Sequence, residues 1–202
     1  MALPEVGKKE SINIQQKSIA WLKSQAMSVL CQVREMEARD VPLIVSYWLD
    51  AESAFLEGMG VDLAKLPARE AMIHFLTRQA SLPLEEKASF CLIWEIGGKA
   101  SGHCNLNPIF RGKEAWMHLH MWRSSKRRQG LGNELVRKSL AVFFQTFDLP
   151  RIISEPYALN PAPNACLPKV GFQFEREYVT TPGSLSFEQP VKRWVMERGR
   201  FA

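Results

Sequence analysis

The chain has 202 residues, and 46% of them are hydrophobic, which is enough for one domain with a single buried core. Its 26 basic and 21 acidic residues give a formal net charge of +5, which suits an anionic ligand but is too small to indicate nucleic-acid binding. No apolar run approaches the ~18 to 20 residues that span a bilayer, and the first twenty positions lack a signal-peptide pattern, so we expect a cytoplasmic protein with no membrane partner.

The first elements are predicted by spacing. Residues 1–27 have scattered apolar positions at helical spacing, and we interpret them as a helical extension before the main domain at 28–202. Alternation over residues 28–36 predicts a strand. Asp40 is a possible helix N-cap, and with Pro42 it predicts a short helix.

The middle of the chain predicts a further helix, a hairpin and another strand. Residues 66–80 repeat the helical pattern, with Ala71, Phe75 and Leu76 along one side. Two β-rich runs, 89–96 and 99–109, are separated by Gly97 and Gly98, the strongest hairpin signal in the chain. Residues 115–122, "AWMHLHMW", predict a strand.

The last part of the chain begins with a long helix after Gly132, in which Val136, Leu140, Phe143 and Phe147 recur at helical spacing. It continues with a short strand at 151–154, a Pro-rich loop, a brief helix ending near Val170, and two strands around 172–178 and 190–197. This order predicts a mixed α/β fold, because it has too many adjacent strands for a plain doubly wound parallel sheet.

The stretch "SSKRRQGLGNEL" places three cations before two glycines, between a strand and a helix start. A helix N-terminus presents unpaired N–H groups, and glycines let an anion come close to the backbone. Arg127 and Arg128 would add charge-assisted contacts to a phosphate. A solvated basic turn that caps an ordinary helix is the simpler alternative.

The pattern Arg127-x-x-Gly130-x-Gly132 resembles the acyl-CoA pyrophosphate loop of the GNAT N-acyltransferase superfamily. A second match lies downstream, where Asn160 is followed nine residues later by Lys169 in "KVGF". The resemblance covers roughly residues 28 to 198. It implies a mixed, partly splayed central sheet of about six to seven strands flanked by helices.

The same resemblance implies an acetyl-CoA cosubstrate, with pantetheine on the strand that ends at Trp122 and the pyrophosphate on the amides of Leu131 and Gly132. The cofactor-binding residues it implies are Trp122, Arg127, Arg128, Gln129, Gly130, Leu131, Gly132, Asn133, Asn160 and Lys169.

A base is needed because an amine with a pKa near ~10.4 is almost fully protonated at pH 7. The strand period places His118 and His120 on one face close to the cofactor loop, and imidazole suits a general base at neutral pH. Either histidine could instead be a hydrogen-bonded interior residue. A zinc site is disfavoured, because no third ligand occurs at a recognisable spacing.

The general acid departs from the family pattern. Many members carry a Tyr seven residues after the Asn, which protonates the leaving thiolate, and here that position is Leu167. Tyr157 could replace it, although a loop aromatic that only packs is the simpler interpretation. An acyl-cysteine at Cys166 is disfavoured, because no electropositive partner adjoins it.

The sequence does not identify the acceptor, which we expect to be a small-molecule or peptide amine, with a monomer or homodimer as the assembly. Asp50, Glu52 and Glu57 could attract a cationic amine, although a solvated helix face is the favoured interpretation. A narrower resemblance is to siderophore-biosynthesis lysine N-acyltransferases, whose aspartate in the Glu-Pro-Asp segment is here Tyr157. The remaining alternatives are a non-catalytic CoA-binding module and, least favoured, a nucleic-acid binder.

Overall fold

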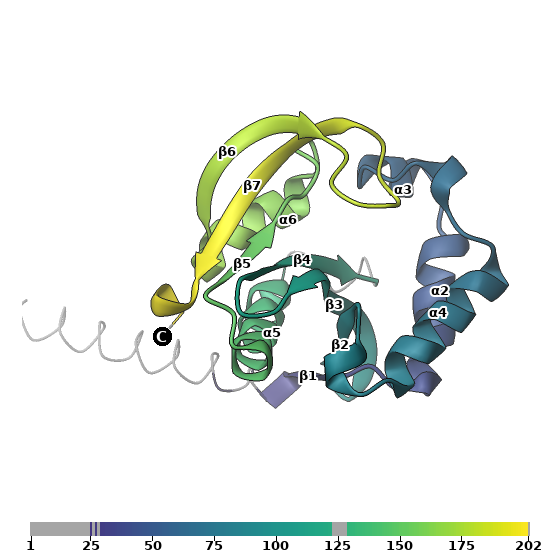
Figure 1. Cartoon of the computed structure of the whole chain (residues 1–202), viewed down its shortest axis with the longest axis horizontal. Coiled ribbons are helices and arrows are strands. Elements are labelled where there is room, and N and C mark those ends of the chain that lie inside the picture. Colours follow the sequence, from purple (N-terminus) through teal and green to yellow (C-terminus); the bar gives the residue numbers. More distant parts are fainter. Residues whose placement is uncertain (1–24, 26, 28, 123–128, 202) are drawn as a thin grey trace, which may run out of the picture.

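The computed structural model of the chain describes residues 25, 27, 29–122 and 129–201. Within this part, seven strands form one sheet in the order β1-β2-β3-β4-β5-β7-β6 (Figure 1). The strands are β1 (Cys31–Glu35), β2 (Phe90–Ile96), β3 (Lys99–Phe110), β4 (Glu114–Met121), β5 (Arg151–Ser154), β6 (Gln173–Thr180) and β7 (Gln189–Glu197).

The helices connect and cover these strands. Short 3-10 turns adjoin several of the helices. Among the described helices none combines the length and apolar character needed to cross a bilayer. The α-helices are α2 (Val41–Leu49), α3 (Ser53–Gly58), α4 (Arg69–Ser81), α5 (Leu131–Phe147) and α6 (Pro161–Cys166), and the turns are η1 (Ala38–Asp40), η2 (Leu63–Lys65), η3 (Leu84–Glu86), η5 (Leu167–Val170) and η6 (Arg198–Arg200).

The sheet is mixed, as the sequence predicted. β4 and β5 run parallel, and the remaining neighbouring strands pair antiparallel. The predicted hairpin is confirmed: Gly97 and Gly98 both have positive φ, 59° and 71°, as a two-residue turn between twisted strands requires.

The main core lies between α5 and one face of the sheet (Figure 1). The predicted apolar stripe of α5 is confirmed, since Val136, Leu140 and Phe143 are fully buried. They pack with the side chains of β2, β3 and β4 that alternate toward this face.

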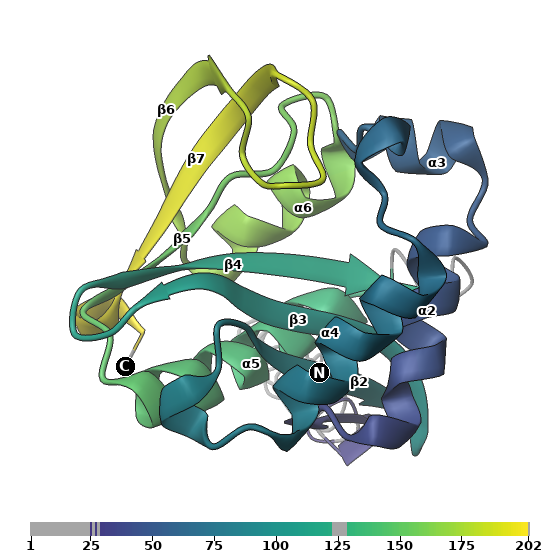
Figure 2. The ribbon, with the colours of Figure 1, turned by 45° about the vertical axis from the view of Figure 1, so that its right-hand side comes forward.

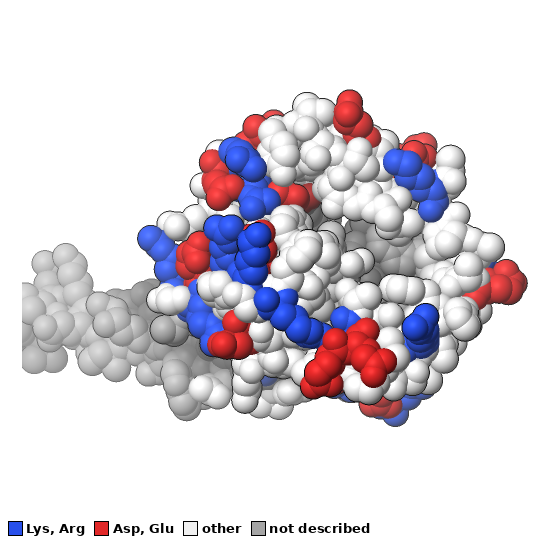
Figure 3. All heavy atoms as spheres, in the orientation of Figure 1, with Lys and Arg blue, Asp and Glu red and all other residues white. Residues whose placement is uncertain are grey.

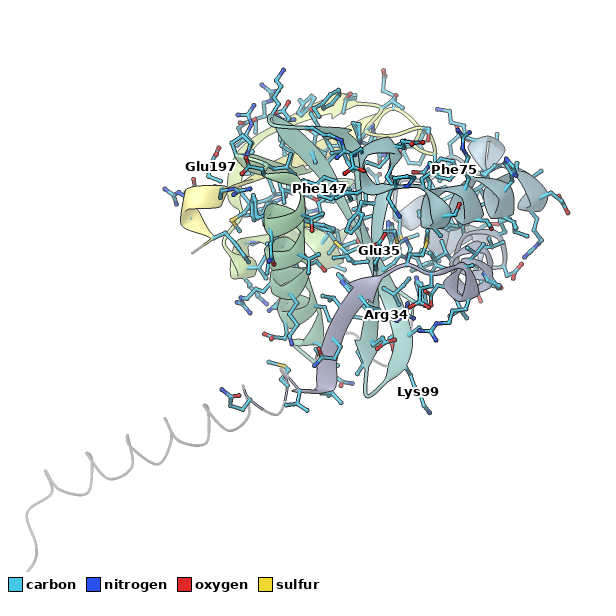
Figure 4. The ribbon with its side chains drawn as sticks, turned by 60° about the horizontal axis from the view of Figure 1, so that its bottom comes forward. Arg34, Glu35, Phe75, Lys99, Phe147 and Glu197 are labelled. Carbon is cyan, nitrogen blue, oxygen red and sulfur yellow. The ribbon has the colours of Figure 1, made fainter. Side chains whose placement is uncertain are left out.

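The opposite face of β1 to β3 is covered by α2 and α4, seen at the right of Figure 1. The prediction of which side of α4 faces the core is wrong. Phe75 is 45% exposed (Figure 4), and the buried positions are Met72 and Gln79, with Leu76 half-buried between them. The Gln79 side chain is buried because its Oε1 accepts hydrogen bonds from the N–H groups of residues 88 and 89.

Asp40 does occupy the position before α2, but its side chain makes no capping hydrogen bond to that helix. Both carboxylate oxygens instead accept from the guanidinium of Arg34 on β1, at 2.6 and 2.7 Å. Arg34 also donates to Glu95 on β2 at 2.8 Å. The aspartate therefore joins the start of α2 to Arg34 on the edge strand of the sheet (Arg34 is labelled in Figure 4), a contact that no local pattern could predict.

Candidate active site

The sheet opens between β4 and β5. The two strands pair only from Glu114 to Trp116 against Arg151 to Ile153, and the Ser154 hydroxyl then donates to the Met117 carbonyl at 2.9 Å. Beyond this link β5, β7 and β6 rise away from β4, as Figure 2 shows. A cavity of about 380 Å³ lies in the opening, where the surface in Figure 3 is hollowed.

Four parts of the chain line this cavity. They are the ends of β3 and β4, the residues after β5, the segment from α2 to the turn after α3, and the loop between β6 and β7. Side chains in the wall include Trp48, Met59, Asn105, Asn107, His118, His120, Glu155, Tyr157, Asn160, Ser186 and Gln189. The predicted shared face of His118 and His120 is confirmed, since Met117, Leu119 and Met121 face the main core and both histidines line this cavity.

The His118 ring is oriented by an irregularity in β3. The register between β3 and β4 shifts between Leu106 and Ile109, which frees the Asn107 carbonyl from the ladder. The Nε2 atom of His118 lies 2.8 Å from that carbonyl oxygen. Because a carbonyl only accepts, Nε2 carries the proton and Nδ1 is the basic nitrogen.

Burial lowers the pKa of His118 below its usual value, although the Asn107 carbonyl and the charge of Glu155 both act to raise it. The imidazole is thus neutral at pH 7, the form that a general base requires.

Glu155 is a site residue that sequence reasoning missed. It directly follows β5 and accepts hydrogen bonds from Trp116 (3.0 Å), Tyr178 (2.6 Å) and Arg193 (2.5 Å). Burial alone would raise the pKa of Glu155, but these three donors outweigh it and lower that pKa. An ionised carboxylate therefore lies in the same cavity wall as His118. Two signals could have indicated it, namely its position directly after a predicted strand and its place as the Glu of the segment compared with Glu-Pro-Asp.

His120 has a different environment. Its ring stacks on the buried ring of His103 with centroids 4.5 Å apart, and its Nδ1 lies 3.2 Å from the Tyr47 hydroxyl. The Trp122 indole donates to Nδ1 of His103 at 2.7 Å. Burial lowers the pKa of His103 to about 3 and holds the pKa of His120 well below its usual value. His120 is consequently neutral at pH 7, with its ring held by the stack on His103 and by the contact with Tyr47.

Tyr157 and Leu167 differ sharply in placement. Tyr157 is half-buried in the cavity wall, with its ring edge-on to Phe187 at 5.8 Å. Leu167 is fully buried in the main core, so no acidic group replaces the usual tyrosine at that position. Cys166 is half-buried, and burial raises the pKa of its thiol to about 11, which keeps it protonated.

Gly130, at the N-cap of α5, and Gly132, in its first turn, are glycines for different reasons. Gly130 adopts φ 77° at the N-cap, a conformation that L side chains rarely take. At Gly132 an added Cβ would meet no atom of the described residues within 4 Å, so this part of the fold does not require a glycine there. The open space beside the first turn of a 17-residue helix suits an anionic group on its N–H donors.

The other predicted cofactor residues are distributed around this end of the molecule. Leu131 is buried at the start of α5, while Asn133 is half-buried and Gln129 is exposed. Arg127 and Arg128 lie outside the described residues. Lys169 is exposed and lies in η5. Its backbone carbonyl accepts a hydrogen bond from the Arg137 guanidinium of α5.

Two further predicted residues, Asn160 and Trp122, have structural partners. The Asn160 side chain caps α6 by accepting from the Ala162 N–H at 3.3 Å, and Asn160 also lines the cavity. Trp122 supports His103 through its indole.

The acidic residues considered for substrate attraction do not line the cavity. Asp50 binds the Arg69 guanidinium and accepts from the Ser46 hydroxyl, and Glu52 and Glu57 are exposed on the α3 segment. The favoured interpretation of these residues as a solvated face agrees with this placement.

Comparison with known proteins adds a sequence family and a fold. A family model described as "Acetyltransferase (GNAT) domain" matches residues 32–173, and no curated protein matches the sequence. Among solved structures, spermidine N-acetyltransferase from Vibrio cholerae in complex with CoA and spermine has a TM-score of 0.70 and 14% identity, over 86% of this chain and 98% of that one.

Two other solved structures are similar to the same extent. Aminoglycoside acetyltransferase AAC(6')-Ib in complex with coenzyme A has a TM-score of 0.65 and 17% identity, over 85% of this chain and 96% of that one. RimL, a ribosomal L7/L12 alpha-N-protein acetyltransferase in complex with coenzyme A, has a TM-score of 0.67 and 14% identity, over 83% and 94%. At these identities the likeness concerns the fold.

Proposed function

The chain belongs to the GNAT acetyltransferase family, and from that premise we propose that it transfers an acetyl group from acetyl-CoA to a primary amine by direct attack. One observation supports this most: a neutral His118, with its basic Nδ1 fixed by Asn107, lies in the cavity where β4 and β5 separate. Coenzyme A is bound in the solved structures with the same fold.

The donor side of the proposal rests on the start of α5. The N–H groups of Leu131 and Gly132 would bind the pyrophosphate, with Gly130 setting the turn and Gly132 leaving room for the anion. From the sequence pattern we assign Arg127 and Arg128 to the same anion, and Gln129, Asn133, Asn160, Lys169 and Trp122 to the remaining contacts with the donor.

On the acceptor side, His118 would remove the proton that the amine must lose. The amine nitrogen then forms the C–N bond, the C–S bond breaks, and the CoA thiolate leaves. Glu155 stabilises the positive charge that develops on His118, because both groups lie in the same poorly solvated wall. Tyr157 is our candidate for the proton that the thiolate takes up, although a thiol pKa of ~8.5 lets the thiolate leave without help.

The test is a thiol-release assay over a broad panel of amines. We expect His118→Ala to lower turnover by ~10² or more with unchanged acetyl-CoA affinity, since general-base catalysis contributes about that much. His74→Ala is the matched control, because His74 is exposed on α4 outside the cavity. A wild-type rate for His118→Ala across pH 6 to 9 would refute the assigned base.

Cofactor binding is tested separately by melting temperature. Acetyl-CoA should raise it, and Gly132→Glu should abolish the rise, because a carboxylate would then fill the space beside the α5 donors. Tight acetyl-CoA binding with no thiol release on any amine would instead favour the non-catalytic CoA-binding module.

A further inference from the structure

The cavity contains almost no uncompensated charge. Among the described residues that line it, Glu155 is the only carboxylate. Its two oxygens already accept from Trp116, Tyr178 and Arg193, and the last of these carries the opposite charge. Residues 123–128, which the structure does not describe, include no aspartate or glutamate.

Of the acidic side chains in the neighbouring segments, Glu57 and Glu188 are exposed to solvent and do not line the wall, whereas Asp50 and Asp62 have partners. Asp50 binds Arg69, and Asp62 accepts from the Ala64 N–H with the Lys65 ammonium 3.7 Å away. The exposed fraction of the Asp62 side chain is 32%, so water screens what charge remains.

The rest of the wall is apolar or neutral. Trp48, Met59, Leu185 and several prolines supply hydrophobic surface, and the two histidines are uncharged because burial lowers their pKa values. Asn105, Ser186 and Gln189 supply neutral hydrogen-bonding groups. A volume of about 380 Å³ is in the range of small-molecule pockets.

We propose that the acceptor carries one primary amine on an uncharged, largely apolar scaffold, and that polycations such as polyamines and aminoglycosides are poor substrates. This inference rests on the proposed acetyl transfer. Each additional ammonium brought into this wall would lose water without gaining a carboxylate partner, and such burial of unpaired charge is strongly unfavourable. The polyamine and aminoglycoside classes named for two of the solved structures of similar fold are therefore the wrong class for this cavity.

Two sources could supply this chemistry, a free monoamine or the α-amine of a polypeptide with uncharged first residues. Both would present one amine to His118 and an uncharged chain to the wall formed by Trp48 and Leu185. The experiment distinguishes them by including both.

The experiment measures kcat/KM from thiol release at pH 7.5 with acetyl-CoA. The probes are phenethylamine and tyramine, a C-terminally amidated peptide whose first four residues are uncharged, spermidine, and kanamycin. We expect kcat/KM for the best single-amine probe to be about 100-fold or more above kcat/KM for either polycation, because burial of an unpaired charge is unfavourable. Equal or higher kcat/KM for spermidine or kanamycin would overturn the inference while leaving acetyl transfer in place. Release with none of the amines would overturn the proposed function, and the inference with it.

A charge variant tests the physical cause. Ser184 lies exposed on the part of the β6–β7 loop that lines the cavity, so Ser184→Asp adds a carboxylate there without disturbing the core. We expect the ratio of kcat/KM for spermidine to that for phenethylamine to rise about tenfold, because a nearby opposite charge partly compensates the second ammonium. Ser53→Asp, on the exposed start of α3 outside the wall, should leave that ratio unchanged. An unchanged ratio in Ser184→Asp, or an equal rise in both variants, would contradict charge as the selecting property.

Discussion

At Gly132 an added Cβ would contact none of the described residues, whereas at Gly130 the backbone itself has a positive φ. The fold therefore needs one of these glycines and tolerates replacement of the other. A glycine that folding does not require, at a helix N-terminus, is best explained by close approach of an anion.

Gly132→Ala should separate folding from binding. Alanine has a higher helix propensity than glycine by roughly 0.5 to 1 kcal/mol, so the free energy of unfolding should stay the same or rise. Acetyl-CoA affinity should fall about tenfold or more, because the methyl group would lie between the helix N–H donors and the phosphate. Urea unfolding and calorimetric titration measure the two quantities. A variant that loses stability, or binds acetyl-CoA as tightly as the wild type, would contradict the assignment.

Glu155 should tune His118 through its charge. The carboxylate raises the pKa of His118, so Glu155→Gln should lower that pKa further and move the acid limb of kcat/KM to lower pH. Turnover at neutral pH should also fall, because the histidine becomes a weaker base.

Glu175→Gln is the matched control for this charge effect. Glu175 is the other carboxylate partner of Arg193, at 2.7 Å, and it lies outside the cavity wall. Its removal should leave the acid limb in place. If the acid limb of kcat/KM in Glu155→Gln is unchanged or moves to higher pH, Glu155 does not act on His118.

Two elements far apart in sequence close the acceptor side of the cavity. The Asp62 N–H donates to the Leu185 carbonyl at 2.8 Å, the Lys65 ammonium donates to the Ser186 carbonyl at 2.7 Å, and the Gln189 amide donates to the Gly60 carbonyl at 2.9 Å. The turn after α3 and the β6–β7 loop thus meet across the opening of the sheet, as Figure 1 shows above β4.

Gly60→Ala should break this contact. Gly60 has φ 89°, and an added Cβ would lie 2.0 Å from Oε1 of Gln189, so backbone and side chain would both have to move. We expect a loss of about 1 to 3 kcal/mol in the free energy of unfolding and a higher KM for the amine, with the KM for acetyl-CoA unchanged. Gly58→Ala is the control, since its Cβ would meet nothing within 4 Å. Equal stability of the two variants would disprove the contact.

Stability of the whole molecule should fall in mild acid, because several histidines are neutral when folded. The pKa of His103 is about 3 in the folded protein, whereas an unfolded histidine titrates near ~6.5. Below pH 6.5 the unfolded chain therefore binds more protons, and the free energy of unfolding decreases as pH falls toward 3. One such histidine contributes about 1.4 kcal/mol per pH unit within that window.

His103→Gln should remove this contribution, since glutamine does not titrate and its carbonyl oxygen can accept from the Trp122 indole. Urea unfolding between pH 6 and 4.5 should show a slope smaller by about one proton than in the wild type. An identical slope in His103→Gln would mean that His103 is protonated in the folded state.

Most of the architecture could be predicted from local pattern. The hairpin at Gly97 and Gly98, the apolar stripe of α5 and the strand that carries His118 each follow from side chains within about ten residues of one another. The pattern on α4 failed because only neighbouring elements decide which side of a weakly apolar helix is covered. The division at residue 28 stays a prediction, since most of residues 1–27 lie outside the described part.

The sequence by itself determined the family through its motifs. It also determined the element order and the shared face of His118 and His120, because short spacing sets turn geometry and strand alternation. The tertiary structure alone decided which partners each histidine has and what charge the cavity offers. Glu155 takes its partners from β4, β6 and β7, and the stacked position of His120 depends on α2 and β3. A pKa depends on burial and on charges brought close in space, and the chain arranges these only when distant segments pack.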